Sequence, residues 1–265
     1  MVTLMLSWAN GLSLAQDIVE TPAFDDWVVD KQASGLCHGY YRQPHFGHPT
    51  SDKSKQTTTI TSDSGEFALD GPSLFQGNVL LNQGQRSIRA DVAKVTRDAQ
   101  SHQIDRIEAQ GHVRILEPNL RLEGETAEVR LQDNVRILRP AAFRLYRKHA
   151  RGTADVITAK GDDYLELEEA TYTTCAPTQN VWELAAKKVT LNKATGRGVA
   201  RDAWLKVKDV RVFYFPYVDF PIDDRRKTGF LYPSYGSSND SGFEFSAPFY
   251  WNMAPNYDWT ITPRW

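Results

Sequence analysis

Two stretches, GNVLLNQGQRSIRADVAKV at residues 77–95 and GHVRILEPNLRLEGETAEV at residues 111–129, align with each other without a gap. In both, apolar and polar residues alternate as in a strand with one buried face, and the apolar residues then change parity, from even to odd numbers. In the first copy they are Ile88 and Ala90 before the change and Ala93 and Val95 after it. An alternation of period two cannot change face without an extra residue, so each copy is predicted to contain a bulge or sharp bend.

A third and looser copy, WELAAKKVTL, occupies residues 182–191. Helical spacing is nearly absent after residue 65, and stacked bent strands bury an apolar face that no single unit could bury. The sequence therefore predicts an all-β fold, a jellyroll or open β-groove of repeated bent strands over residues 65–217. A domain boundary is expected at residue 218, where the composition changes, and residues 218–265 form a second region.

Composition excludes several classes of protein. The chain has 265 residues, 41% hydrophobic and 24% charged, which is ordinary for a folded protein and excludes disorder throughout. A formal net charge of −2 gives no global field that would attract nucleic acid or an anionic surface. No run of eighteen apolar residues is present, so no transmembrane helix is predicted, whereas barrel strands remain allowed.

The N-terminal 64 residues are expected to contain two segments. Residues 1–15 have the apolar run and small-residue ending of a secretory signal, but the first basic residue is Lys31; a signal peptide with a wrong or trimmed start and a short N-terminal helix both fit. Residues 16–64 are interpreted as an N-terminal segment and polar linker. Export would make Cys37 and Cys175 candidates for disulfide formation.

Beyond residue 212 the composition changes, with crowded aromatics and then the charge cluster at residues 223–227. Residues 230–251 read as two strands around a polar turn, each weakened by a proline near its middle, Pro233 and Pro248. The alternation through residues 243–252 fits a strand of an outer-membrane barrel with its aromatic girdle, and equally a strand of a soluble sandwich. A third strand starts near Trp259, and the sequence is expected to be a fragment of a longer protein.

Motifs for catalysis are absent from the sequence: it has no phosphate loop, nucleophile elbow or HExxH helix, so no catalytic residue and no cofactor is predicted. Cys37, His38, His45 and His48 have the residue types of a zinc site but no familiar spacing, and solvated loop histidines are the favoured reading, so no metal is predicted. Residues 136–151 contain five Arg and one Lys. They fit either a phosphate-bearing ligand or a solvated basic edge.

The apolar residues of the repeats fit two readings. They form a packed core in most proteins, but a bent-strand groove left partly open would offer an apolar trough for acyl chains. Periodicity does not separate the two. The candidate groove residues are Val79, Leu81, Ile88, Val113, Ile115, Leu122 and Leu184.

Three motifs resemble one family. EATYTTCAPTQNVWELAAKKVTLN at residues 169–192, FYFPYVDFPIDDRRKTGFLYPSYG at residues 213–236 and APFYWNMAPNYDWTITPR at residues 247–264 resemble the LptD (OstA) family, outer-membrane proteins that insert lipopolysaccharide into the outer leaflet of Gram-negative bacteria. The resemblance covers about residues 70–265. It implies a periplasmic jellyroll, which receives lipopolysaccharide from the bridge protein LptA, followed by a large barrel plugged by the lipoprotein LptE.

The resemblance also implies roles for individual residues. In that family two N-terminal cysteines pair with two near the far end of the barrel, so the partners of Cys37 and Cys175 would lie beyond Trp265, although the two could pair in an assembly intermediate or in this fragment. Pro233 and Pro248 match prolines that weaken the seam of a lateral gate. Lipopolysaccharide phosphates would meet basic residues such as Arg144 and Arg147.

Two other functions remain open at this stage. The first is an exported β-repeat stalk or adhesin with a barrel anchor, which would need an exposed repeat face. The second is a jelly-roll enzyme acting on envelope sugars, which would need clustered inward acids or histidines.

Overall fold

The structure is a computed structural model, and it describes most of the chain. The described residues are 2–4, 26–30, 37, 39–44, 58–68, 71–98, 100–101, 103–177, 180–223, 225–231, 234–238, 242–246 and 248–263. Almost all of them lie in strands or in the turns between strands, so the predicted all-β fold is confirmed. No helix long and apolar enough to cross a membrane occurs within these ranges.

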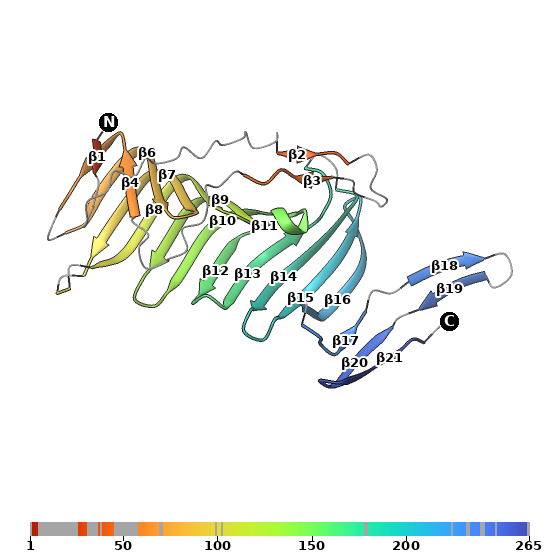
Figure 1. Ribbon diagram of the computed structural model, residues 1–265. Coiled ribbons are helices and arrows are strands. Elements are labelled where there is room, and N and C mark those ends of the chain that lie inside the picture. Colours follow the sequence, from red (N-terminus) through yellow and green to blue (C-terminus); the bar gives the residue numbers. More distant parts are fainter. Residues whose placement is uncertain are drawn as a thin grey trace.

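One large antiparallel sheet of fourteen strands makes up most of the described structure (Figure 1). Its neighbours follow the order β1-β4-β6-β7-β8-β9-β10-β12-β13-β14-β15-β16, with β5 paired to β6 and β11 paired to β10. Its strands are β1 (Val2–Leu4), β4 (Thr58–Ser62), β5 (Ser64–Glu66), β6 (Ser73–Gln83), β7 (Arg86–Arg97), β8 (Ile104–Glu117), β9 (Leu120–Arg130), β10 (Val135–Leu145), β11 (Ala150–Ala154), β12 (Val156–Lys160), β13 (Tyr164–Tyr172), β14 (Trp182–Asn192), β15 (Arg197–Val207) and β16 (Val210–Pro221).

Each of the first two repeats contains a bulge, as predicted, but it lies in β6 and β8 at the start of the copy, whereas the parity changes lie in β7 and β9. In β6 the register with β7 shifts between Gln76 and Val79, and in β8 the register with β9 shifts between Gln110 and Val113. The intervening Gly77 and Gly111 both have left-handed backbones, with φ of 74° and 75°. An added Cβ at either glycine would contact an aspartate carboxyl group at under 3 Å, so space as well as φ favours glycine there.

In the third copy the strand bends without an extra residue. Pairing of β14 passes from Ala186 to Lys188 on both sides with no shift of register. Lys187 is flanked across the strands by Glu169 and Asp202, which have left-handed φ of 48° and 50°. The predicted bend is therefore present, but it is produced by the backbone of the neighbouring strands rather than by an inserted residue.

The bends of successive strands line up across the sheet and form a crease. Two prolines, Pro140 in β10 and Pro216 in β16, lie at positions with no cross-strand partner in β9 and β15, so their missing N–H groups cost the sheet no hydrogen bond. Small buried side chains line the inside of the crease; they are Ala90, Ala93, Ala109, Ala127, Ala141, Ala154, Ala170 and Ala203. The crease divides every long strand into two arms, and the sheet folds toward the apolar side.

Smaller sheets lie at both ends of the chain. β2 (Trp27–Val28) pairs with β3 (Tyr40–Tyr41), and Figure 1 shows this hairpin lying along the large sheet. After β16 come β17 (Gly229–Phe230), β18 (Ser234–Ser238), β19 (Gly242–Ser246), β20 (Phe249–Ala254) and β21 (Tyr257–Ile261). They form a sheet of order β17-β20-β21 and a β18–β19 hairpin, and they project from the β16 end in Figure 1.

The domain bounds expected from sequence differ from the strands in two places. The expected N-terminal segment and polar linker at residues 16–64 contain β2, β3 and all of β4, where TTITS, rich in β-branched residues, forms a strand despite its polar composition. The expected boundary at residue 218 falls inside β16, which continues its pairing with β15 as far as Pro221. Residues 5–15 of the expected signal segment lie outside the described residues.

Candidate functional site

An apolar row crosses the first arm of the large sheet from one edge to the other. Ile60 pairs with Leu81, Leu81 with Ile88, and Ile88 with Ile115, each on the next strand. The same row continues through the pairs Ile115–Leu122, Leu122–Phe143, Tyr172–Leu184, Leu184–Leu205 and Leu205–Phe213. Since directly opposite residues share a face, these side chains form one continuous apolar surface.

A second apolar row crosses the other arm, beyond the crease. Its successive cross-strand pairs are Phe75–Ala93, Ala93–Ala109, Ala109–Ala127, Ala127–Leu138, Leu138–Ile157, Ile157–Leu167, Leu167–Val189, Val189–Ala200 and Ala200–Val218. Residues from both arms belong to one buried cluster, including Phe143 of the first arm and Leu167 of the second. The two arms therefore meet in this cluster, and the apolar inner side of the folded sheet is called the groove below.

The inner apolar side chains are buried at one end of the groove and exposed at the other, and these are called its closed and open ends. Val79 on β6 and Val113 on β8 are 3% and 1% exposed, whereas Leu184 on β14 is 38% exposed and Phe213 on β16 is 58% exposed. The end with the exposed side chains adjoins β16, from which the chain continues into the small C-terminal sheets.

The seven candidate groove residues all belong to this inner surface, but they differ in exposure. Val79 and Val113 are buried, so they form part of the packed core. Leu81, Ile88, Ile115 and Leu122 are half-buried, and Leu184 is exposed. Sequence reasoning missed Phe143, Leu205 and Phe213, because their strands lie outside the recognised repeats; the same period-two pattern marks them.

The face of the sheet opposite the groove carries a buried ionic cluster. Arg121 and Glu123 flank Leu122 in β9 and therefore point away from the groove. Arg121 donates a hydrogen bond of 2.6 Å to Glu123, while Arg144 pairs with Asp26 at 2.8 Å. Burial alone would raise the pKa of Glu123, but the hydrogen bond from Arg121 and the charges of Arg121, Arg144 and Arg114 outweigh it and lower that pKa.

This cluster binds the N-terminal hairpin to the sheet. Asp26, only 1% exposed, precedes β2, and its carbonyl accepts a hydrogen bond of 2.6 Å from the N–H of Arg42 after β3. The ring of Tyr41 packs edge-on against Trp27 and Tyr146. Arg144, expected to meet a phosphate, is thus engaged with Asp26 beneath this hairpin and outside the groove.

Other basic residues of the stretch 136–151 also bind within the chain. Arg136 donates to the carbonyl oxygen of Gly161 at 2.7 Å. Arg151 donates to the carbonyl oxygens of Cys175 and Ala176. Arg147, the other residue expected to meet a phosphate, is exposed in the short 3₁₀ turn Tyr146–Lys148. The described structure does not bring Arg144 and Arg147 together at one site in the groove.

Cys37 and Cys175 form a disulfide with each other, with 4.6 Å between their Cα atoms. The family resemblance implied partners beyond residue 265 for the mature protein, and the structure instead has the pairing allowed for an intermediate or a fragment. Thr173, whose hydroxyl accepts a hydrogen bond from the N–H of Cys175, fixes the backbone on the sheet side. Of the histidines considered as metal ligands, His38, His45 and His48 lie outside the described residues.

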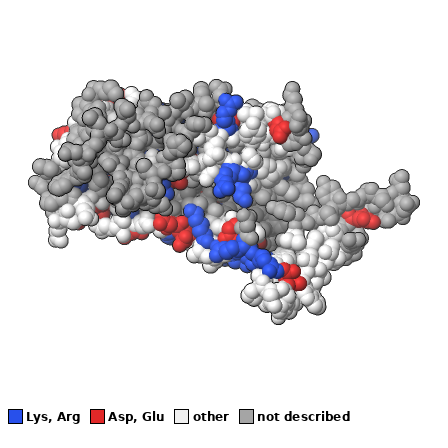
Figure 2. Space-filling model, viewed as in Figure 1, with Lys and Arg blue, Asp and Glu red and all other residues white. Residues whose placement is uncertain are grey.

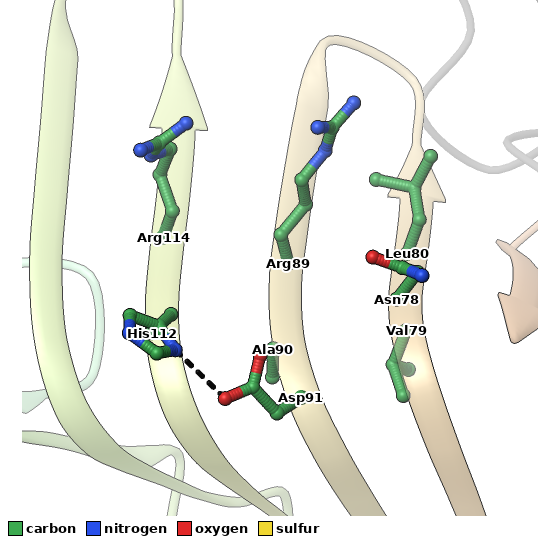
Figure 3. Close-up of a pocket in the computed structure, with 8 residues that line it drawn as sticks. All are labelled: Asn78, Val79, Leu80, Arg89, Ala90, Asp91, His112 and Arg114. Carbon is green, nitrogen blue, oxygen red and sulfur yellow. Dashed lines mark hydrogen bonds and ion pairs between the residues drawn. The ribbon is translucent and has the colours of Figure 1, made fainter. Parts of the chain in front are cut away.

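A polar hollow of about 330 Å³ lies across β6, β7 and β8 (Figure 3). His112 contacts the carboxylate of Asp91 at 2.8 Å, and this hydrogen bond raises the pKa of His112. Arg114 donates to Glu123 at 3.2 Å. Asp91 and His112 are thus paired within the hollow, Arg114 pairs with Glu123 beyond its lining, and Val79 and Ala90 of the inner surface also line it.

The two expected strands at residues 230–251 are each interrupted. β19 ends at Ser246 and β20 begins at Phe249, so Pro248 lies in the break. Its carbonyl oxygen accepts a hydrogen bond of 2.8 Å from the N–H of Leu231, which joins the two segments at this point. Pro233 lies outside the described residues, between β17 and β18. In β21 the expected third strand is confirmed.

Two family models match this chain. Residues 59–158 match the model described as LptA/(LptD N-terminal domain) LPS transport protein, and residues 199–264 match the model described as LptD protein. The chain belongs to the LptD family. The first match covers the closed half of the groove, and the second covers its open end together with the C-terminal strands.

Relatives in this family are similar over nearly the whole chain. The LPS-assembly protein LptD of Hahella chejuensis is 36% identical over 96% of this chain and 33% of its own length. The LPS-assembly protein LptD of Acinetobacter baumannii is 39% identical over 91% of this chain and 31% of its own length. The chain thus spans about a third of the length of these LptD relatives. A solved structure of LptH from Pseudomonas aeruginosa, described as an LptA homologue, has a TM-score of 0.36 and 16% identity over 42% of this chain and 80% of that chain.

Proposed function

We propose that this chain carries lipopolysaccharide along the groove of its large sheet toward the outer membrane. The observation that carries the proposal is the pair of apolar rows, which face each other across the crease and become more exposed toward β16. Acyl chains are the ligand such a surface fits, because burying apolar area drives their transfer from water. The LptD relatives are named as LPS-assembly proteins.

The surroundings of the groove follow from the same proposal. The large sheet lies in the periplasm, where LptA delivers lipopolysaccharide to it, and the strands after residue 221 begin an outer-membrane barrel that LptE plugs. The exposed apolar side chains of β20 and β21 support a lipid-facing surface; Trp251, Trp259 and Ile261 are 45%, 61% and 50% exposed. The chain acts as a conduit and performs no chemical step.

Pro233 and Pro248 belong to a lateral gate in this proposal. Parting two barrel strands in lipid costs backbone hydrogen bonds that nothing replaces, and a proline removes one donor beforehand. The break between β19 and β20 at Pro248 is the structural support for this role. The β-repeat stalk has no such support, since it needs an exposed repeat face and Val79, Ala93 and Val113 are buried.

Photo-crosslinking in the full-length protein tests the groove. A benzophenone amino acid at Ile88, Leu122 or Leu184 is expected to capture lipopolysaccharide in living cells. Arg89 and Ala185, the sequence neighbours of Ile88 and Leu184, point to the opposite face and serve as matched controls. Equal capture at inner and outer positions, or capture at neither in a folded protein, would contradict transport through the groove.

A further inference from the structure

The short segment between β16 and β17 makes contacts in two directions. Figure 2 shows Lys and Arg side chains running along the lower edge of the large sheet toward the small sheets. The side chains of Asp223, Arg225 and Lys227 face one neighbour, and those of Arg226 and Thr228 face another. Ile222 joins the first group through its backbone N–H.

The first group binds the turn between β14 and β15. Arg225 donates to the carbonyl oxygens of Lys193 and Ala194 at 2.8 and 2.9 Å. Lys227 donates to the carbonyl oxygen of Gly196 and, at 2.7 Å, to the carboxylate of Asp223. Hydrogen bonds from Arg225 and Lys227 hold the pKa of Asp223 well below its usual range, so this carboxylate stays charged.

Gly196 makes room for this charged cluster. Its φ is 63°, and an added Cβ would collide with the side chains of Asp223, Lys227 and Arg225. The carbonyl oxygen of Gly196 also accepts a hydrogen bond of 3.1 Å from the N–H of Ile222. The segment therefore packs directly onto the turn.

Arg226 and Thr228 bind the sheet formed by β20 and β21. Arg226 donates to the hydroxyl of Tyr250 at 2.8 Å, to the carbonyl oxygen of Pro255 at 3.1 Å, and pairs with Asp258. Thr228 accepts a hydrogen bond of 3.1 Å from the N–H of Asn252. Since single exposed ion pairs contribute little, the attachment depends on this set of bonds acting together.

We propose that residues 222–223 and 225–228 form a positioning clamp, in which Arg225 holds the segment to the large sheet and Arg226 holds the β20–β21 hairpin. The clamp fixes the angle between the open end of the groove and β20, which begins directly after Pro248. This inference rests on the proposed function, because it gives the fixed angle a role in passing lipid from the groove to the gate.

The test measures the angle and the transport separately in the full-length protein. Spin labels on non-native amino acids at Leu131 and Asn256, both in exposed turns, report the distance between the large sheet and the β20–β21 hairpin. Gly196→Ala and Arg226→Gln are expected to broaden this distance distribution, with at least about a fivefold fall in the ratio of clamped to displaced hairpin, the low end of typical couplings. Lipopolysaccharide delivery is expected to slow in parallel.

Two controls match these variants. Gly161 has the same left-handed backbone, with φ of 64°, but no atom lies within 4 Å of an added Cβ, so Gly161→Ala shares the strain without the collision. Arg136 contacts a turn carbonyl and the carboxylate of Asp162 within the large sheet, as Arg226 does between sheets. Gly161→Ala and Arg136→Gln are expected to leave both the distance and the delivery unchanged.

The outcomes separate the clamp from the proposed function. An unchanged distribution in both clamp variants, or wild-type delivery despite a broadened one, overturns the clamp while crosslinking in the groove still supports transport. If Gly196→Ala fails to fold, exchanging the charges by Arg226→Asp with Asp258→Arg is expected to recover the narrow distribution that Arg226→Asp alone loses. Failure to recover overturns the clamp. Absence of lipid crosslinking in the wild type contradicts the function instead.

Discussion

Leu138→Ala tests whether the crease is packed as closely as the structure indicates. Leu138 is 3% exposed, and its cross-strand partners Ala127 and Ile157 are 7% and 6% exposed. Its Cδ1 atom lies 2.9 Å from the position that a Cβ on Gly124 would occupy. Glycine and alanine have no rotamer that could fill the space left by the leucine, so we expect a residual cavity.

The expected cost follows from that cavity. Leucine-to-alanine substitutions in cores cost about 2–5 kcal/mol, and a site that cannot collapse belongs to the upper part of the range, about 4 kcal/mol. Since each kcal/mol lowers the melting temperature of a domain of 150–250 residues by about 2–4 °C, the expected fall is about 8–16 °C. Leu131→Ala, at a site 48% exposed, is the control and should change stability by less than about 0.5 kcal/mol.

Near-ultraviolet circular dichroism during thermal unfolding measures this difference. A fall in melting temperature no larger than that of the Leu131→Ala control would show that the crease is not tightly packed. Gly124→Ala added to Leu138→Ala is a second check. It should not rescue stability, because the new Cβ still collides with the carbonyl oxygen of Pro140; recovery would contradict the geometry of the crease.

Two further predictions concern charge and the open end of the groove. Asp91 raises the pKa of His112 above its ordinary value of 6.5, so the stabilisation from this pair is complete below about pH 6.5 and is lost as pH rises through the folded-state pKa; an NMR titration should show a raised midpoint that Asp91→Asn returns to normal. Leu184→Glu, at a position 38% exposed, should change stability by less than about 1 kcal/mol yet reduce lipid capture by a crosslinker at Leu205 about tenfold. Undiminished capture would place the lipid elsewhere.

The groove follows from local sequence signals, and the structure shows why. The parity changes in β7 and β9 predict that each repeat bends, and the inserted residues lie on the preceding strands, at Gly77 in β6 and Gly111 in β8. The bend at Lys187 leaves the same signal without an inserted residue. Its cause lies in the left-handed residues of the two neighbouring strands, Glu169 and Asp202, which periodicity along one strand does not reveal.

Contacts between distant residues were not predictable in the same way. Arg144 was considered as a phosphate contact because basic residues cluster near it, yet its partner, Asp26, lies 118 residues earlier in the chain. The cluster at residues 223–227 was recognised only as a change of composition. Arg225 and Arg226 are adjacent in the sequence, but the different surfaces they bind are known only once the strands are placed.

The alignment of the bends across successive strands has a consequence for the length of the groove. Neighbouring strands lie about 4.8 Å apart, so the eleven successive strands from β4 to β16 give a path of about 50 Å. Length is thus set by the number of strands and width by the position of the bend within each strand. An acyl chain moving along this path would leave the apolar side chains of one strand as it met those of the next. It would therefore cross many small free-energy barriers of similar height in place of one large barrier.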